Sequence, residues 1–231
     1  MTKTFLGKRV AFITAHPDDE SYLAGGTIYK NAQLDGQSFL LCATRGEKGV
    51  AHLRRPTSTR ALAARRWREL QACAKVLRIA KLVCGTFPDG GLYTRRPALQ
   101  RWLGKRLKIL KPEAIVSFGP EGITGHLDHI AIAQAAQRLA RELRVPYFAF
   151  TLPPVFHAEA GKALQARRFS SHYSSKDLRF AKPTLRVPIS GAVKRRALRC
   201  HTSQLDNGKA FTGYPAYAVR AMLRAEYFVA H

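Results

Sequence analysis

Short apolar runs rich in β-forming residues alternate with segments of helical periodicity along the first 150 residues of the chain. The strand-like runs lie at residues 8–15, 37–46, 80–87, 113–119 and, as a fifth, within 145–156. Helical spacing fills the segments between them, at residues 26–36, 59–78, 97–110 and 129–144. This alternation predicts βαβ units with right-handed crossovers. The expected fold class is therefore α/β, Rossmann-like, with a mainly parallel sheet and helices on both faces.

The remainder of the chain is less regular. Residues 153–190 predict an irregular excursion at the rim of a pocket, with one more strand at 184–190, and two helices are expected near 191–201 and 213–227. The chain of 231 residues is 46% hydrophobic and 23% charged, an ordinary balance for a globular protein. Because no linker or repeat divides it, we expect a single domain over residues 1–231.

Polar motifs directly follow four of the predicted strands. They read, in chain order, AHPDDE, TRGEKG, FPDGG and GPEGITGHLDH. In parallel sheets, ligands bind beyond the carboxyl ends of the strands, near the point where the strand order reverses. No G-x-G-x-x-G follows the first strand, which argues against the usual dinucleotide site. We therefore expect a functional site of another kind at this edge.

Two of these motifs carry metal-ligand residue types at short spacing. His16 and Asp19 are three positions apart, and so are His126 and His129, with Asp128 between them. Two imidazole nitrogens, one carboxylate and a water are typical of a catalytic zinc site, and iron(II) accepts the same ligands. The first motif alone also fits a helix start capped by a carboxylate. Two such clusters at one sheet edge favour a metal.

The motifs AHPDDES and GITGHLDHIAI together resemble those of the PIG-L/LmbE-like deacetylases, zinc enzymes that remove acetyl groups from N-acetylglucosamine-type sugars. The shorter segments TRGEKG, RRWREL, FPDGGL and HTSQ follow in the same order, so the resemblance covers most of the chain. Leu127 stands where the family usually has proline, and no ligand is lost. The resemblance implies a metal-dependent N-deacetylase that releases acetate and a free amine through attack of metal-bound hydroxide.

The same resemblance implies the roles of the residues in the two motifs. Three residues would hold zinc: His16, Asp19 and His129. Asp18 would be the general base that takes a proton from the water. His126 would polarise the amide oxygen and protonate the departing amine, and Asp128 would orient and charge its imidazole ring.

Three further residues would contact the substrate by this resemblance: Arg66, Asp89 and His201. Considered without the family, each has a structural explanation. Arg66 also fits a solvated arginine on a helix, Asp89 a turn aspartate in PDGG, and His201 a cap at the end of a helix.

The chain is strongly basic, with 39 Lys and Arg against 15 Asp and Glu and a formal net charge of +24. This charge attracts polyanions nonspecifically and is compatible with an anionic amino-sugar conjugate as substrate. Two alternatives stay open: a zinc amidohydrolase acting on a non-sugar acyl amide, and a basic polyanion-binding protein on a former enzyme scaffold.

The sequence shows neither a signal peptide nor a membrane-spanning run, so a cytoplasmic protein is expected. The oligomeric state is left open.

Overall fold

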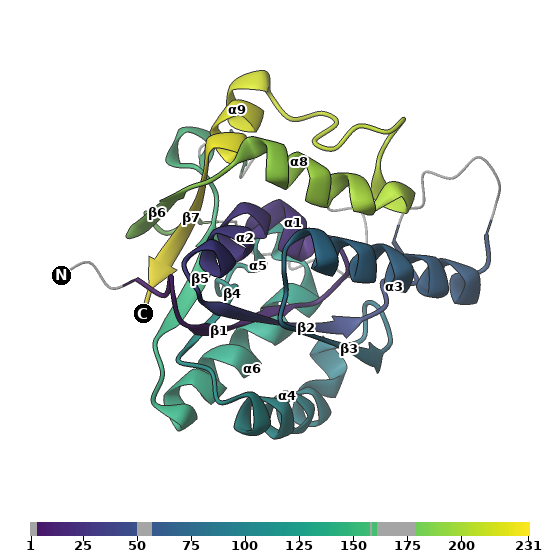
Figure 1. Cartoon of the computed structure of the whole chain (residues 1–231). Helices are drawn as coiled ribbons and strands as arrows, with labels where there is room; N and C mark the ends of the chain where they lie inside the picture. Colours follow the sequence, from purple (N-terminus) through teal and green to yellow (C-terminus); the bar gives the residue numbers. More distant parts are fainter. Residues whose placement is uncertain (1–3, 50–56, 158, 161–178) are drawn as a thin grey trace.

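Seven strands form one sheet in the computed structural model, which describes residues 4–49, 57–157, 159–160 and 179–231 (Figure 1). Their order across the sheet is β3-β2-β1-β4-β5-β7-β6. The strands are β1 (Arg9–Thr14), β2 (Gln37–Thr44), β3 (Lys81–Phe87), β4 (Ala114–Phe118), β5 (Tyr147–Thr151), β6 (Leu185–Pro188) and β7 (Ala225–Ala230). The first five are parallel to one another, as the sequence predicts, and β7 runs antiparallel to both β5 and β6.

Strand β1 lies in the middle of the parallel part, between β2 and β4. The chain first builds outward from β1 to β2 and β3, and then returns to place β4 and β5 on the other side. The strand order therefore reverses between β1 and β4, which is where open parallel sheets of this kind bind ligands.

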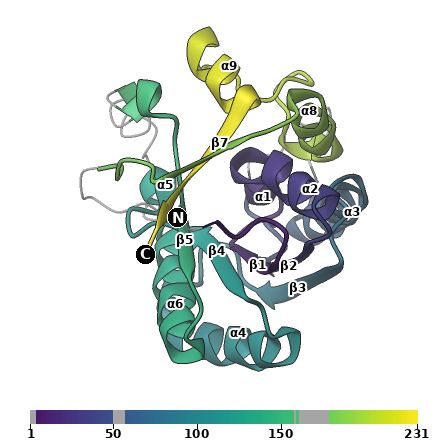
Figure 2. The ribbon, with the colours of Figure 1, turned by 60° about the vertical axis from the view of Figure 1, so that its left-hand side comes forward.

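Helices cover both faces of the sheet (Figures 1 and 2). Helices α1, α2, α3 and α8 lie on one face, and α4 and α6 pack together on the other. The α-helices are α1 (Asp19–Leu23), α2 (Gly25–Gln33), α3 (Thr59–Val76), α4 (Arg96–Leu110), α5 (Gly122–Gly125), α6 (Leu127–Leu143), α8 (Gly191–Cys200) and α9 (Ala216–Arg224). Short 3₁₀ turns are η1 (Tyr93–Arg95), η2 (Pro154–Phe156) and η3 (Thr202–Gln204). None of the helices in the described ranges is long and apolar enough to cross a membrane.

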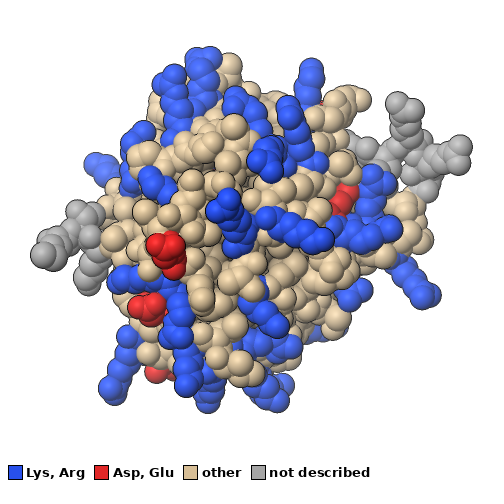
Figure 3. Space-filling view, in the orientation of Figure 1, with Lys and Arg blue, Asp and Glu red and all other residues tan. Residues whose placement is uncertain are grey.

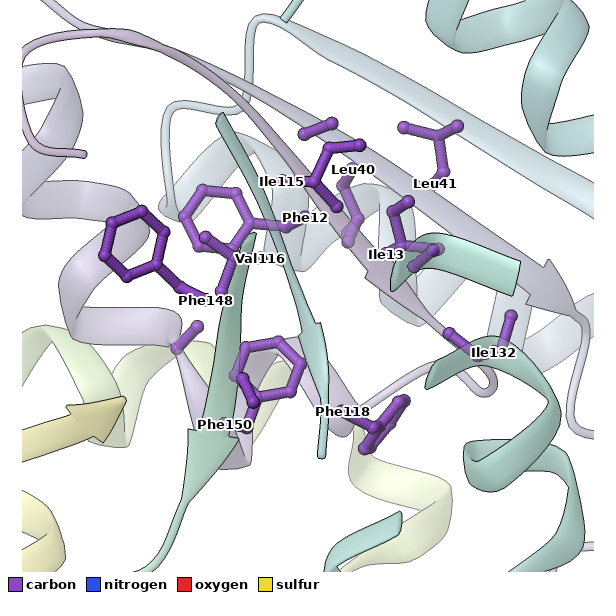
Figure 4. Close-up of a cluster of buried hydrophobic side chains, with 14 of the residues drawn as sticks. Phe12, Ile13, Leu40, Leu41, Ile115, Val116, Phe118, Ile132, Phe148 and Phe150 are labelled. Atoms are coloured by element: carbon purple, nitrogen blue, oxygen red, sulfur yellow. The ribbon is translucent and has the colours of Figure 1, made fainter. Parts of the chain in front are cut away.

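The core lies between the central strands and these helices. Residues from β1, β2, β4 and β5 meet there, among them Phe12, Leu40, Val116 and Phe148 (Figure 4). Every residue of β4 and β5 is buried, because parallel strands with helices on both faces have no solvent-exposed side. This rigid centre fixes the loops that leave the carboxyl ends of β1 and β4.

The prediction of a helix over residues 213–227 is wrong at its end. Helix α9 ends at Arg224, and the following AEYFVA segment forms β7 between β5 and β6. Hydrogen bonding to two neighbouring strands outweighs the helical spacing of the segment. Within the predicted excursion at 153–190 the structure describes η2 and β6, while residues 158 and 161–178 lie outside the described part, so the pocket-rim prediction is untested.

Candidate active site

Loops from the adjacent strands β1 and β4 bring His16, Asp19 and His129 together. All three side chains are buried, with His16 just after β1, Asp19 at the start of α1 and His129 in the first turn of α6. His129 Nε2 lies 3.3 Å from both His16 Nδ1 and Asp19 Oδ1. Ligand atoms about 2.0–2.1 Å from a tetrahedral zinc ion are about 3.3 Å apart, so this spacing fits one small cation.

The hydrogen bonds of the two rings determine which nitrogens face each other. His129 Nδ1 lies 2.9 Å from the Gly122 carbonyl oxygen, which can only accept, so Nδ1 carries the proton. On the other ring, His16 Nε2 lies 3.1 Å from Asp89 Oδ1 and 3.3 Å from Asp128 Oδ2. His129 Nε2 is therefore unprotonated and faces His16 Nδ1 across 3.3 Å, so the two nitrogens can share either a proton or a metal ion.

The electrostatics of these three clustered residues favour positive charge at this point. Burial alone would lower the pKa of His16, but the hydrogen bonds that its ring donates to Asp128 and Asp89 and the charge of Asp19 raise that pKa to about 10. Burial opposes the ionisation of Asp19, yet His129 and His16 hold its pKa well below the usual range. Asp19 is also fixed through Oδ2, which accepts from the His16 backbone N–H at 2.8 Å. The site therefore presents an ionised carboxylate ready to bind a cation.

Asp18 occupies the turn into α1 with a φ of 110°, in the left-handed region that aspartate tolerates better than most residues. It makes no side-chain capping bond, so the capped-helix interpretation of this motif does not apply to it. Its carboxylate lies 3.3 Å from the Arg66 guanidinium and is 18% exposed. Burial, with a contribution from Asp19 and against that of Arg66, raises the pKa of Asp18 to about 6.

His126 is the N-cap of α6, and its Nδ1 accepts from the Asp128 backbone N–H at 3.1 Å. Burial and the neighbouring charges of His129 and His16 lower the pKa of His126 to about 3, so the ring is neutral and its proton is on Nε2. The Asp128 carboxylate accepts from the backbone N–H groups of Gly90 and Leu92, each at 2.8 Å, besides contacting His16. Asp128 thus supports His16 through its carboxylate and His126 through its backbone.

The predicted substrate contacts Arg66, Asp89 and His201 are buried beside the ligand residues. Arg66 is 3% exposed and donates to the carbonyl oxygens of Gly46 and Pro17, so the alternative of a solvated helix arginine is wrong. Asp89 accepts from a backbone N–H as well as contacting His16.

His201 is the C-cap of α8 and lies 2.7 Å, through Nε2, from Glu20 Oε1. None of Arg66, Asp89 and His201 is among the described residues that line the cavity considered next, so their contact with substrate stays a prediction.

A cavity of about 350 Å³ opens onto this centre, and Asp18, Asp19 and His129 line one part of it. Sequence reasoning missed the rest of its wall, which includes Tyr22 and Phe211. Tyr22 lies one helical turn beyond Asp18, which is a signal that could have found it. Phe211 comes from a distant segment that no local pattern connects to the motifs.

Comparisons with known protein sequences agree on one family. The family described as PIG-L, GlcNAc-PI de-N-acetylase, matches residues 11–140. A probable N-acetyl-alpha-D-glucosaminyl L-malate deacetylase 2 of Bacillus anthracis is 32% identical over 160 residues, which cover 67% of this chain and 70% of that protein. A 1D-myo-inositol 2-acetamido-2-deoxy-alpha-D-glucopyranoside deacetylase of Salinispora arenicola is 25% identical over 262 residues. That alignment covers 97% of this chain and 85% of the Salinispora protein.

Solved structures show the same fold. The N,N'-diacetylchitobiose deacetylase from Pyrococcus horikoshii superposes with a TM-score of 0.67 at 22% identity, over 97% of this chain and 84% of that one. The family match spans more than half of the chain and contains all three clustered residues His16, Asp19 and His129. This chain therefore belongs to the PIG-L family.

Proposed function

We propose that this protein is a zinc-dependent N-deacetylase, one domain over residues 1–231, which hydrolyses the acetamide of an N-acetylglucosamine conjugate. The observation that carries the proposal is the convergence of His16 Nδ1, His129 Nε2 and Asp19 Oδ1, with the second nitrogen of each ring bound elsewhere. The acidic Asp18 lines the same cavity. A basic polyanion-binding protein has no use for the clustered ligand residues or for a further, partly exposed carboxylate beside them.

His16, Asp19 and His129 would hold the metal, since they are the clustered residues with ligand atoms facing one another. The chemistry that a bound zinc ion supplies is Lewis acidity toward a water molecule and the amide carbonyl.

The residues of the chain divide the remaining work. Asp18 takes the proton of the attacking water. The Asp18 carboxylate is held in place by the Arg66 guanidinium, 3.3 Å away. His126 donates its Nε2–H to the carbonyl oxygen as negative charge develops there. A neutral His126 ring has a single proton, which faces the carbonyl oxygen. The departing nitrogen therefore takes the proton that Asp18 has accepted, in place of the His126 proton expected from the sequence, and the Asp18 carboxylate ends the cycle ionised again.

The names of the relatives support an amino-sugar substrate, since they specify deacetylation of glucosaminyl malate, glucosaminyl inositol and diacetylchitobiose. The basic excess supports an anionic conjugate. On the face shown in Figure 3 the Lys and Arg side chains are spread widely rather than gathered in one stripe, which favours general attraction of anions over a dedicated polyanion track. We place the activity in the cytoplasm because all four cysteines are free thiols.

The test is amine release from neutral and acidic N-acetylglucosamine conjugates, with bound metal identified and measured for each sample. Wild type is expected to bind one zinc ion per chain and release amine. Asp18→Asn should keep the zinc and lose about 10²–10⁴-fold in kcat, the range of a lost general base. Asp35→Asn, at an exposed loop position, is the matched control and should behave as wild type.

Two results would contradict the proposal. Loss of zinc without loss of turnover in a His16→Ala variant would remove the metal from the reaction. Equal turnover by Asp18→Asn and wild type would remove the proposed base.

A further inference from the structure

The cavity continues from the proposed catalytic centre along a wall of large apolar side chains that the hydrolysis itself does not use. They come from α1, α5, the end of β5, the segment between η3 and α9, and α9. The seven are Tyr22, Leu23, Ile123, Leu152, Phe211, Tyr214 and Met222. A sugar ring stacks on one aromatic side chain through its C–H face, so a wall with this many apolar side chains offers contact to a further, apolar part of the ligand.

Three of these side chains form a connected aromatic surface. The rings of Tyr22 and Phe211 meet edge to face at a centroid distance of 5.2 Å and an angle of 89°. The rings of Phe211 and Tyr214 are 6.0 Å apart at 82°, and Tyr214 rests on Phe156 at 5.6 Å. Edge-to-face contacts of this kind fix ring orientation, so the surface is formed before a ligand arrives.

Backbone strain falls on the same wall. Ile123 has a φ of 61° and a ψ of −58°, and Phe211 has a φ of 66°. Bulky residues rarely adopt positive φ, and such residues gather at ligand-binding positions. Within the described chain, every other non-glycine residue with positive φ is charged or polar. Ile123 and Phe211 are the apolar ones, and both line this cavity.

Further polar residues line the cavity beside these apolar side chains. Lys209 and Thr212 are exposed, whereas the three aromatic side chains are partly buried and Ile123 is buried. The cavity therefore combines the carboxylates and imidazole of the centre with partly buried aromatic side chains and exposed polar ones.

We propose that the substrate carries an apolar group next to its acetamide-bearing sugar, and that Tyr22, Phe211 and Tyr214 bind this group. The inference rests on the proposed function and adds the substrate class. The apolar group is either an aromatic or alkyl aglycone or an N-acyl chain longer than acetyl, because both present the same chemistry to the wall.

The experiment compares kcat/KM of the zinc-loaded enzyme on three glucosamine derivatives. These are the N-acetyl methyl glycoside, the N-acetyl 4-nitrophenyl glycoside and the N-butanoyl methyl glycoside. We expect at least one of the two apolar derivatives to exceed the first by tenfold or more. The 4-nitrophenyl compound identifies the aglycone as the bound group, and the N-butanoyl compound identifies the acyl chain.

Variants of the aromatic wall test whether these side chains cause the preference for the apolar derivative. Phe211→Ala and Tyr214→Ala should reduce the ratio of kcat/KM between the preferred and the methyl substrate at least threefold, at unchanged zinc content. The control is Ile109→Ala, which removes a hydrophobic side chain that is 79% exposed on α4 and should leave the ratio unchanged.

The outcomes separate the two proposals. Release of amine from all three derivatives at similar kcat/KM would overturn the apolar-group inference and leave the deacetylase standing. Unchanged ratios in Phe211→Ala and Tyr214→Ala would overturn it as well. No amine from any of these derivatives or from the acidic N-acetylglucosamine conjugates, at full zinc occupancy, would refute the proposed function.

Discussion

A buried ion pair joins the C-terminal part of the fold to the helices that carry the proposed site. Lys194 Nζ on α8 lies 2.8 Å from Glu226 Oε1 on β7, and the two side chains are 1% and 2% exposed. Lys194 also donates to the Tyr22 carbonyl oxygen at 2.7 Å, and Glu226 accepts from the first backbone N–H groups of α2 at 3.0 and 2.7 Å. We predict that Lys194→Met strongly destabilises the protein.

The magnitude follows from what each variant leaves behind. Removing one partner of a buried pair costs about 3–5 kcal/mol, because the other charge stays buried and unpaired. The two N–H groups of α2 still bind Glu226, so Lys194→Met should cost about 3 kcal/mol, at the lower end of that range. In Glu226→Gln the lysine keeps only neutral acceptors, and a similar cost is expected. The double variant removes both charges. Its loss of unfolding free energy should be smaller than the sum of the two single losses by about 2 kcal/mol or more.

Urea unfolding at pH 7 and fixed zinc concentration, followed by circular dichroism, measures all four proteins. Zinc concentration must be constant because a ligand bound only to the folded state raises its apparent stability. A loss below about 1 kcal/mol for Lys194→Met, or additivity within about 0.5 kcal/mol, would refute the reasoning that the pair is held by mutual charge compensation.

Three further predictions concern single side chains. Asp128→Asn weakens the contact that supports His16 Nε2, so zinc affinity should fall about 10–100-fold in competition with a chelator; unchanged affinity would contradict that supporting role. The hydrogen bond that Cys73 donates, against the effect of burial, lowers the pKa of Cys200 to about 7, so iodoacetamide should label Cys200 first, with a rate midpoint near pH 7 in mass spectrometry. Burial opposes ionisation of Glu69, but hydrogen bonds from the hydroxyl groups of η3 lower its pKa overall. Its stabilising effect is therefore present above the unfolded pKa of about 4.3 and lost as pH falls, so the stability gap between wild type and Glu69→Gln should narrow from about pH 5 to pH 3.

The parallel part of the fold could be predicted because its signals are local. Each of the first five strands is a short apolar run followed by a turn and a periodic helix, and the motifs at their ends necessarily meet at one sheet edge. Strand β7 could not be predicted in this way, since its conformation depends on pairing with β5 and β6. Propensity within the segment does not contain that information.

The side chains of the site likewise divide into those predictable from local sequence and those that depend on tertiary contacts. His16, Asp19 and His129 are recognisable by type and spacing, whereas the burial of Arg66 depends on the carbonyl groups of two loops that come from other strands. The contact between Tyr22 and Phe211 is likewise tertiary, so neither the helix nor the loop that carries these rings reveals it alone.

The clustered polar groups of the cavity and most of its apolar wall come from different stretches of the chain. The clustered metal-ligand residues and Asp18 lie within the family-matched residues 11–140, whereas Leu152, Phe211, Tyr214 and Met222 come from the sequence beyond them. Mutations that reshape the later stretch can alter the wall without touching the proposed hydrolytic groups. Such an arrangement lets selectivity evolve separately from chemistry, and it makes chimeras that exchange the C-terminal segment between relatives a rational route to enzymes with new substrate preferences.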